Sequence, residues 1–275
     1  MTTPPARLIK AARSGIRLKY CVLGSGSRGN CVLVSTGRVR VVVDCGFHLK
    51  ETRERLGRAG VEVERLDAVL LTHEHHDHVQ GAGPVSNGFK APVFATAGTQ
   101  AAAARALKSV GRCEPMAAGA SFVLGDLEIE PVGKPHDAAE PTSFLFHHGG
   151  LTLGVFTDLG SVDAAVGAAI SRCDALCLEA NHDPARLRAG PYPPRLKARI
   201  ASERGHLSNE QSARAVARWA TPRLKRLVVC HLSETNNTAD DVKRAFLEHM
   251  GPPGAVERRF SFQDRPTPVY DVAPA

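Results

Sequence analysis

The feature that most constrains this chain is a cluster of metal-ligand side chains directly after an apolar strand. The apolar segment 68–71 is followed, one residue later, by His73, His75, Asp77 and His78. His73 and His75 are two residues apart, so an extended backbone directs both imidazoles to the same side. Four such groups would be costly to bury without an ion, and imidazole with carboxylate suits Zn, Mn or Fe. The cluster therefore predicts a metal site where a strand ends.

Three more potential ligands, His136, Asp158 and His231, each follow an apolar run farther along the chain. Two metals about 3.5–4 Å apart need roughly five to seven ligands, one of them a bridging carboxylate. Asp158 is the predicted bridge, because its two oxygens can bind both ions. The chain supplies seven candidate ligands in all, which are His73, His75, Asp77, His78, His136, Asp158 and His231.

Hydrophobic patterning predicts many short strands with a few helices and no break that would mark a domain boundary. The arrangement favours an α/β fold, with two sheets packed face to face and helices outside, in a single domain of residues 16–275. Residues 1–15 carry Arg7, Lys10 and Arg13 and are expected to be a flexible basic tail. The predicted strands are 16–23, 31–35, 39–44, 68–71, 92–96, 121–124, 127–132, 143–147, 151–156, 175–179 and 224–230, and the predicted helices are 49–59, 99–110, 162–171, 195–203, 209–219 and 239–250.

Composition excludes several classes of protein. Apolar residues make up 43% of the chain, but the longest apolar runs have strand length and are too short to span a bilayer. The first fifteen residues contain no hydrophobic stretch of the kind that a secretory signal needs. Seven cysteines form no regular framework, which favours reduced thiols. We therefore expect a cytoplasmic protein that makes no use of a membrane.

The positive charge of the chain is concentrated in one segment. Residues 186–226 contain eleven lysines and arginines against two acids, whereas the net charge of the whole chain is only +7. This segment is either a solvated helical face or a surface that binds the phosphates of a nucleic acid. Aromatic residues are only 5% of the chain, which argues against an extensive base-stacking platform and favours recognition of the backbone.

The ligand pattern resembles that of the metallo-β-lactamase superfamily in residue type and in order, from about Leu18 to Val272. Val43-Asp44-Cys45-Gly46 is similar to the early Asp-x-Gly motif of that superfamily, whose aspartate braces the metal loop. Four further segments resemble its YycJ (WalJ) branch, and these are 23–30, 179–183, 205–209 and 231–237.

This resemblance implies a fold and an activity. The fold would be the αββα sandwich, and the cofactors would be two divalent ions, Zn or Mn. The branch consists of metal-dependent nucleases, including 5′-to-3′ DNA exonucleases, which points to DNA as the partner and to DNA repair as the setting. Attack by a metal-activated water on phosphorus would cleave the chain, and Asp77 would help to orient that water.

His206 needs separate consideration because it lies in a turn between two basic helices rather than at a strand end. It is either a neighbour of a helix cap, with Ser208 or Asn209 as the cap, or a general acid that protonates the leaving oxygen. The resemblance favours the acid, with Glu179 orienting it. The candidate substrate contacts are Ser25, Ser27, Asn30, His182, Ser208, Asn209, Ser233 and Asn236, and His182 is equally able to cap the following segment.

Two other functions fit the same ligands. A hydrolase of a small phosphodiester, thioester or lactone would keep both metals but have no use for the basic segment. A module that only binds DNA or a partner would be expected to have lost ligands, and none of the seven is replaced. The sequence leaves open Zn against Mn, DNA against RNA, exonuclease against endonuclease, and the oligomeric state.

Overall fold

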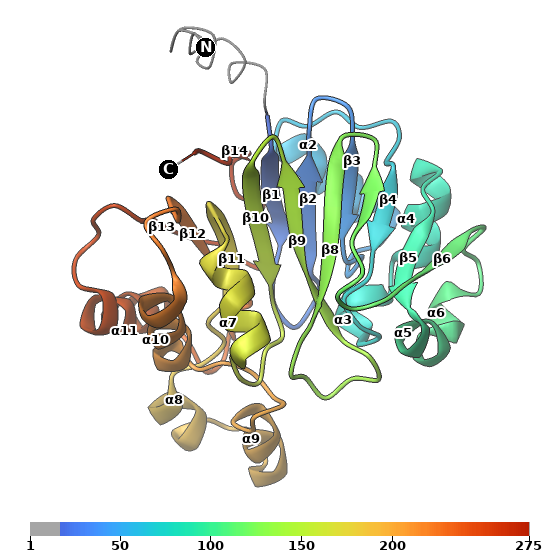
Figure 1. The fold of residues 1–275 in the computed structure, drawn as a ribbon. Coiled ribbons are helices and arrows are strands. Elements are labelled where there is room, and N and C mark those ends of the chain that lie inside the picture. Colours follow the sequence, from blue (N-terminus) through green and yellow to red (C-terminus); the bar gives the residue numbers. More distant parts are fainter. Residues whose placement is uncertain (1–16, 275) are drawn as a thin grey trace, which may run out of the picture.

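The computed structural model describes residues 17–274, so the predicted tail 1–15 lies outside the described residues. Two seven-stranded sheets lie face to face (Figure 1). The first sheet, in spatial order, contains β14 (Tyr270–Asp271), β1 (Lys19–Gly24), β2 (Cys31–Ser35), β3 (Arg40–Val43), β4 (Ala68–Leu70), β5 (Val93–Thr96) and β6 (Cys113–Met116). The second contains β13 (Glu257–Phe260), β12 (Arg226–Cys230), β11 (Ala175–Glu179), β10 (Leu151–Phe156), β9 (Thr142–His148), β8 (Leu127–Gly133) and β7 (Phe122–Leu124).

The two sheets have the same internal plan. In the first sheet, neighbouring strands pair antiparallel from β14 to β3 and parallel from β3 to β6. In the second sheet, they pair antiparallel from β7 to β10 and parallel from β10 to β13. Because β8 and β10 both run antiparallel to β9, β8 points the same way as the parallel strands β10 to β13. The carboxyl ends of these strands therefore lie at one edge of the sheet, where α/β proteins commonly place their ligands.

Helices cover the outer face of each sheet, which gives four layers. The helices are α2 (Leu49–Arg58), α3 (His76–Val79), α4 (Ala82–Phe89), α5 (Ala97–Ala102), α6 (Ala104–Leu107), α7 (Ala164–Ser171), α8 (Pro184–Ala189), α9 (Pro194–Ile200), α10 (Asn209–Trp219) and α11 (Ala239–Met250). Leu56 and Phe89 bring α2 and α4 onto the first sheet. Val166, Val216 and Phe246 bring α7, α10 and α11 onto the second.

An apolar core lies between the two sheets. Tyr20 and Val34 of the first sheet pack in one cluster with Phe144, Phe146 and Leu153 of the second, and all five are fully buried. Burial of a side chain of this size contributes about 1.5–3 kcal/mol relative to leaving it exposed. This shared core confirms the predicted fold class of two mixed sheets with helices outside.

Several predicted elements match the structure closely and others differ from it. Helices α10 and α11 have the predicted bounds, whereas the single helix predicted over 99–110 is wrong: α5 ends at Ala102 and α6 begins at Ala104. Strands β6, β13 and β14 were not predicted. All three lie at the ends of their sheets, where one side is unpaired and the sequence carries no buried alternation; Pro115 in β6 is tolerated for that reason.

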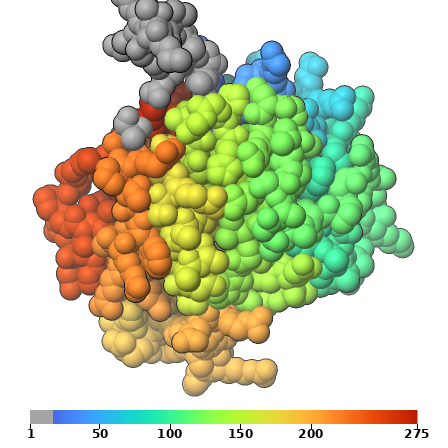
Figure 2. Space-filling view, viewed as in Figure 1, coloured from blue at the N-terminus to red at the C-terminus, as the bar shows by residue number. Residues whose placement is uncertain are grey.

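No helix in the described range 17–274 combines the length and apolar character needed to cross a membrane. In the space-filling view, the chain around α8 and α9 protrudes from one end of the molecule (Figure 2). This protrusion lies at the same end as the loops that follow β8 and β10 (Figure 1).

Candidate metal centre and active site

Every predicted ligand lies at or beyond the carboxyl end of a strand, and the fold brings these ends together. His73 follows β4, His136 follows β8, Asp158 follows β10 and His231 follows β12, while Asp44 directly follows β3. The site therefore lies across the seam between the two sheets. Neither sheet could supply the full ligand set alone.

The backbone turns sharply at three of these positions. Asp44, Asp158 and His231 have φ values of 63°, 57° and 55°. Residues other than glycine rarely adopt this left-handed conformation, which costs on the order of 1–3 kcal/mol per residue. Strain of this kind persists where the surrounding structure enforces it, and here it directs each side chain into the cluster just after its strand ends.

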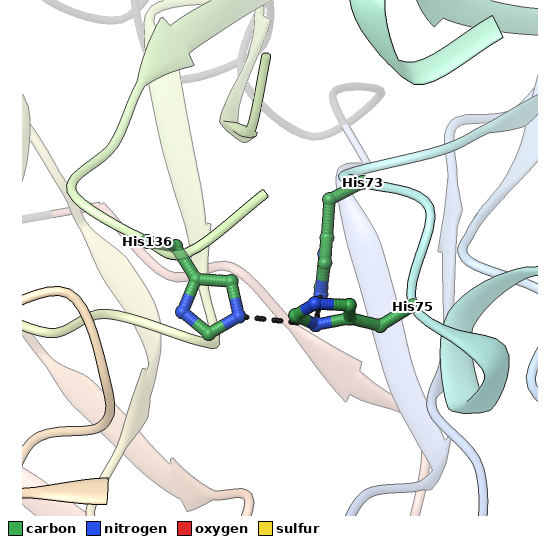
Figure 3. Close-up of side chains that lie close together, drawn as sticks. All are labelled: His73, His75 and His136. Atoms are coloured by element: carbon green, nitrogen blue, oxygen red, sulfur yellow. Dashed lines mark hydrogen bonds between the residues drawn. The ribbon is translucent and has the colours of Figure 1, made fainter. Parts of the chain in front are cut away.

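The first cluster joins three imidazoles from both sheets. His75 Nδ1 lies 2.9 Å from His73 Nε2 and 3.3 Å from His136 Nε2, so three ring nitrogens converge on one point (Figure 3). Burial lowers the pKa of all three rings, and that of His136 to about 3. The rings are therefore neutral, and a neutral imidazole offers the lone pair that a metal ion requires.

The outer nitrogens of two of these rings are held by the protein. Thr72 Oγ1 lies 2.8 Å from His73 Nδ1. The His136 Nδ1–H donates to the carbonyl of Gly205 at 3.0 Å, and the Arg204 guanidinium donates to the His136 carbonyl. Such contacts fix the ring orientation and leave Nε2 free for an ion.

The second cluster contains Asp77, His78 and His231. Asp77 Oδ2 lies 3.4 Å from His78 Nε2 and 3.8 Å from His231 Nε2, and it accepts a hydrogen bond from Asn30 Nδ2 at 3.1 Å. Burial by itself would lower the pKa of His78 and His231, but carboxylates, with Asp158 first, outweigh it and raise both, that of His231 to about 10. Without an ion, the carboxylates thus draw protons onto these rings.

Asp158 lies between the two clusters and is the predicted bridge. Its carboxylate is buried, with Oδ2 3.3 Å from His78 Nε2 and Oδ1 3.6 Å from His231 Nε2, and one of its oxygens also groups with a nitrogen of His73. Asp158 Oδ2 and His231 Nε2 are buried and have no hydrogen-bond partner within the described range 17–274. Buried atoms of this kind are costly unless an ion satisfies them, so the donor set fits a divalent metal.

Asp44 supports the ligands from behind. Its carboxylate accepts hydrogen bonds from the backbone N–H and hydroxyl of Thr72 and, at 2.7 Å, from the Nδ1–H of His78. The loop that contains Gly46 packs tightly against the metal loop, because a Cβ on Gly46 would lie 1.9 Å from the Asp77 carbonyl oxygen. Asp44 thus holds His78 with its Nε2 directed at the second cluster.

Glu179 joins the metal cluster to His206. The fully buried carboxylate accepts hydrogen bonds from the ring Nδ1–H groups of His206 and His231, both at 3.0 Å, and from the backbone N–H groups of Asp158 and Leu207. Burial would raise the pKa of Glu179, but the two rings, His206 first, lower it to about 2. Because His206 binds Glu179 through Nδ1 and lines the cleft described below, its Nε2 is available to a substrate.

Lys134 is a buried charge that sequence reasoning missed. Its ammonium donates to the Thr157 carbonyl at 2.6 Å, and burial lowers its pKa against the opposing pull of nearby carboxylates, with Asp158 and Asp44 first. Lys134 therefore offsets part of the negative charge beneath the cluster. The sequence feature that could have identified Lys134 was its position two residues before His136, at the end of an apolar strand.

A cleft of about 400 Å³ opens above the cluster. Two of the eight candidate substrate contacts, Ser27 and Ser233, line it. Of the other six, Ser25 and Asn30 are buried and bonded to each other, and the Ser25 hydroxyl also accepts the backbone N–H of His231. These two residues shape the site from below rather than from the cleft wall.

The remaining four candidates lie outside the cleft lining. Ser208 caps α10 in a capping box with Gln211, which was the alternative considered for this turn. The Asn209 amide pairs with Asn237, and the amide of the buried Asn236 has no hydrogen-bond partner in the part of the chain that the structure describes. His182 is buried as well, and burial lowers its pKa to about 4.

Sequence reasoning also missed part of the cleft wall. Asn181, Tyr192, Leu196, Arg199 and Ile200 line the cleft, and four of them belong to α9 or to the linker before it. No local motif marked these residues. They face the cluster only because the chain between β11 and α10 folds back over the strand ends.

The basic segment 186–226 carries less free charge in the structure than in the sequence. Five of its eleven basic side chains form ion pairs with carboxylates, and four of those carboxylates come from outside the segment. The pairs are Arg186–Asp241, Arg199–Asp137, Arg214–Glu210, Arg223–Asp174 and Arg226–Glu257. Arg188 and Arg195, in α8 and α9, are exposed and have no carboxylate partner within residues 17–274.

Comparisons with known proteins agree with this geometry. A family model described as a beta-lactamase superfamily domain matches residues 39–232. The chain is 35% identical to exodeoxyribonuclease YycJ of Bacillus anthracis, over 80% of this chain and 84% of the relative. It is 35% identical to exodeoxyribonuclease WalJ of Streptococcus pneumoniae, over 86% and 87%. The metallo-beta-lactamase fold protein YhfI of Bacillus subtilis superposes with a TM-score of 0.69 at 18% identity, over 93% of this chain and 99% of that one.

The chain belongs to the metallo-β-lactamase superfamily, and its sandwich of two mixed sheets is the fold of that superfamily. The resemblance to the YycJ and WalJ proteins, which the motifs predicted, is confirmed over most of its length. The protein is thus an enzyme of a hydrolase superfamily, and its fold implies divalent metal ions at the cluster of histidines and aspartates.

The support that Asp44 gives to His78 leads to a first prediction. Asp44→Asn should weaken metal binding by about 10- to 100-fold, because the His78 Nδ1–H loses its charged acceptor. Competition of Zn²⁺ between the protein and a chromophoric chelator measures this loss. Asp126→Asn, which changes the same charge at a carboxylate bonded to Thr36, should leave the affinity unchanged. An unaltered affinity in Asp44→Asn would contradict the assigned role.

Proposed function

We propose that the protein is a binuclear metal-dependent phosphodiesterase that hydrolyses nucleic acid, and specifically a 5′-to-3′ DNA exonuclease. The observation that carries the proposal is the pair of donor clusters, which lie on either side of one buried carboxylate beside His206. The names of the relatives, exodeoxyribonucleases, support DNA as the substrate. The 5′-to-3′ polarity follows the resemblance of the motifs to the YycJ (WalJ) branch.

The two clusters divide the predicted ligands into two sets of three. His73, His75 and His136 would hold one ion, and Asp77, His78 and His231 would hold the other, with Asp158 shared between them. Mixed nitrogen and oxygen donors accept Zn or Mn. When bound, two such ions supply an activated water and stabilise the negative charge on the phosphate oxygens.

The residues around the ligands perform the remaining chemistry. His206, held by Glu179 at Nδ1, donates its Nε2 proton to the departing sugar oxygen, which imidazole does well near neutral pH. Asp77, which lines the cleft and keeps one oxygen bonded to Asn30, accepts a hydrogen bond from the attacking water and orients it. His206 and Asp77 both line the cleft, so both can act on a phosphate bound there.

The substrate strand would run along α8 and α9. Arg188 and Arg195 on these helices are exposed and have no carboxylate partner within residues 17–274, whereas Arg199, which lines the cleft, is paired with Asp137. Clustered cations of this kind hold a polyanion through its phosphates with little dependence on sequence. A cytoplasmic location, with a place in DNA repair, is consistent with the seven free cysteines and with a DNA substrate.

The substrate is tested with metal-stripped protein that is reloaded with Zn²⁺ or Mn²⁺. End-labelled single- and double-stranded DNA should shorten from the 5′ end, RNA serves as the comparison, and Asp77→Ala should abolish the reaction. If no polymer is cleaved while metal analysis finds the ions bound, the proposal is wrong. A small phosphodiester, thioester or lactone would then be the substrate.

The variant His206→Ala tests whether His206 acts as the general acid or as a metal ligand. Loss of the proton donor should lower kcat by about 10²- to 10⁴-fold while the metal content stays unchanged. Single-turnover kinetics and elemental analysis measure the two quantities. His48→Ala, at an exposed histidine outside the cleft lining, is the matched control. Loss of metal in His206→Ala would instead make His206 a ligand.

The basic helices predict a salt dependence. In the double variant Arg188→Gln with Arg195→Gln, the slope of log KM against log salt should fall by about 1–2, since each lost phosphate contact removes roughly 0.7–0.9. Arg105→Gln with Lys108→Gln, two exposed residues at α6, removes the same charge and should leave the slope unchanged. Equal slopes in wild type and the α8–α9 variant would exclude a strand on these helices.

A further inference from the structure

The cleft above the metal cluster has walls of different chemistry. Its floor consists of the histidines and aspartates, and Ser27, Asn181 and Ser233 supply polar groups at its side. The remaining wall, which comes from α9 and the linker before it, presents Tyr192, Leu196 and Ile200 together with Arg199, whose guanidinium is paired with Asp137. The three uncharged side chains have no role in holding a phosphate, so they require a separate explanation.

Tyr192 is held in place by its neighbours in the sequence. Pro191 precedes it and Pro193 follows it, and proline fixes its own φ and confines the preceding residue to extended conformations. The linker also rests directly on the strand-end loops, because a Cβ on Gly190 would lie 2.4 Å from Asn236 Oδ1. The backbone that carries the half-buried Tyr192 is therefore restricted.

Leu196 and Ile200 continue this wall along one face of α9. They are four residues apart, so their side chains lie on the same side of the helix. Ile200 is buried and Leu196 is half-buried. Together with Tyr192 they line the same cleft as the predicted metal ligands.

The wall has a fixed position relative to the metal ligands. Arg199 of α9 forms an ion pair with Asp137, the neighbour of His136, and the His206 N–H donates to the Ile200 carbonyl at 2.9 Å. Arg204, in the turn after α9, donates to the His136 carbonyl. The loop that carries His136 and the turn that carries His206 thus fix the position of α9 relative to the predicted metal ligands.

We infer that Tyr192, backed by Leu196 and Ile200, stacks on the base of the nucleotide being removed, so the cleft takes one unpaired terminal nucleotide. This inference rests on the proposed nuclease function. A cleft of about 400 Å³ is near the lower end of ligand pockets, which span about 300–1,000 Å³, and it suits one nucleotide rather than a base pair. A terminal base of a duplex must then leave its partner before cleavage.

Removal of the stacking ring should lower kcat/KM only for 5′ ends that carry a base. Tyr192→Ala should lower kcat/KM for a 5′-terminal nucleotide with an intact base on the order of 5- to 150-fold, and Tyr192→Phe should retain most of the activity. On DNA whose 5′-terminal residue is abasic, Tyr192→Ala and wild type should be equal. Leu247→Ala, an exposed apolar residue of α11, is the matched control and should match wild type on both substrates.

A binding measurement tests the stacking role of Tyr192 independently of nuclease activity. Calorimetry with metal-loaded protein compares a deoxynucleoside 5′-monophosphate with deoxyribose 5-phosphate. Tyr192→Ala should weaken binding of the nucleotide and leave that of the sugar phosphate unchanged. Equal effects of Tyr192→Ala on both ligands, or on intact and abasic ends, would overturn the stacking role. Failure of the wild type to cleave any nucleic acid would overturn the nuclease proposal alone, since the calorimetric comparison still decides the role of Tyr192.

Discussion

The buried carboxylate of Glu179 is the interaction on which the rest of the site depends. It ends β11 and accepts hydrogen bonds from the backbone of Asp158 and Leu207 and from the rings of His206 and His231. A charge buried without such donors would cost several kcal/mol. The same four groups therefore stabilise the carboxylate and are positioned by it. Glu179 thus links the loops after β10 and β12 to the turn before α10.

The charges beneath the cleft explain why the site suits cations. The carboxylates of Asp44, Asp158 and Glu179 are buried within a few residues of strand ends, and Lys134 is a buried cation that offsets only part of their charge. The neutral imidazoles of the first cluster add donors without adding charge. Divalent metal would offset the negative charge that Lys134 leaves, which is consistent with the Asp158 oxygen that has no hydrogen-bond partner among residues 17–274.

The fold was predictable where elements are buried and periodic. Helix α10 begins at the capping box of Ser208 and carries its apolar face onto the second sheet, so a local signal defines its start. The edge strands β6, β13 and β14 carry no such signal. They form because a neighbouring strand offers free hydrogen-bonding groups, and that partner is distant in the sequence for β14, whose Tyr270 pairs with Tyr20.

The sequence by itself determined the superfamily, the two-sheet fold and the candidate ligands, because each ligand directly follows an apolar strand and the motifs around it are local. Only the tertiary structure decided which groups meet across the seam. It placed Glu179 beside His206, neutralised Arg199 and Arg223 with distant carboxylates, and turned Tyr192 toward the cleft. The physical reason is that strand ends and caps depend on short-range patterns, whereas charge pairing and cleft walls depend on contacts between residues far apart in the chain.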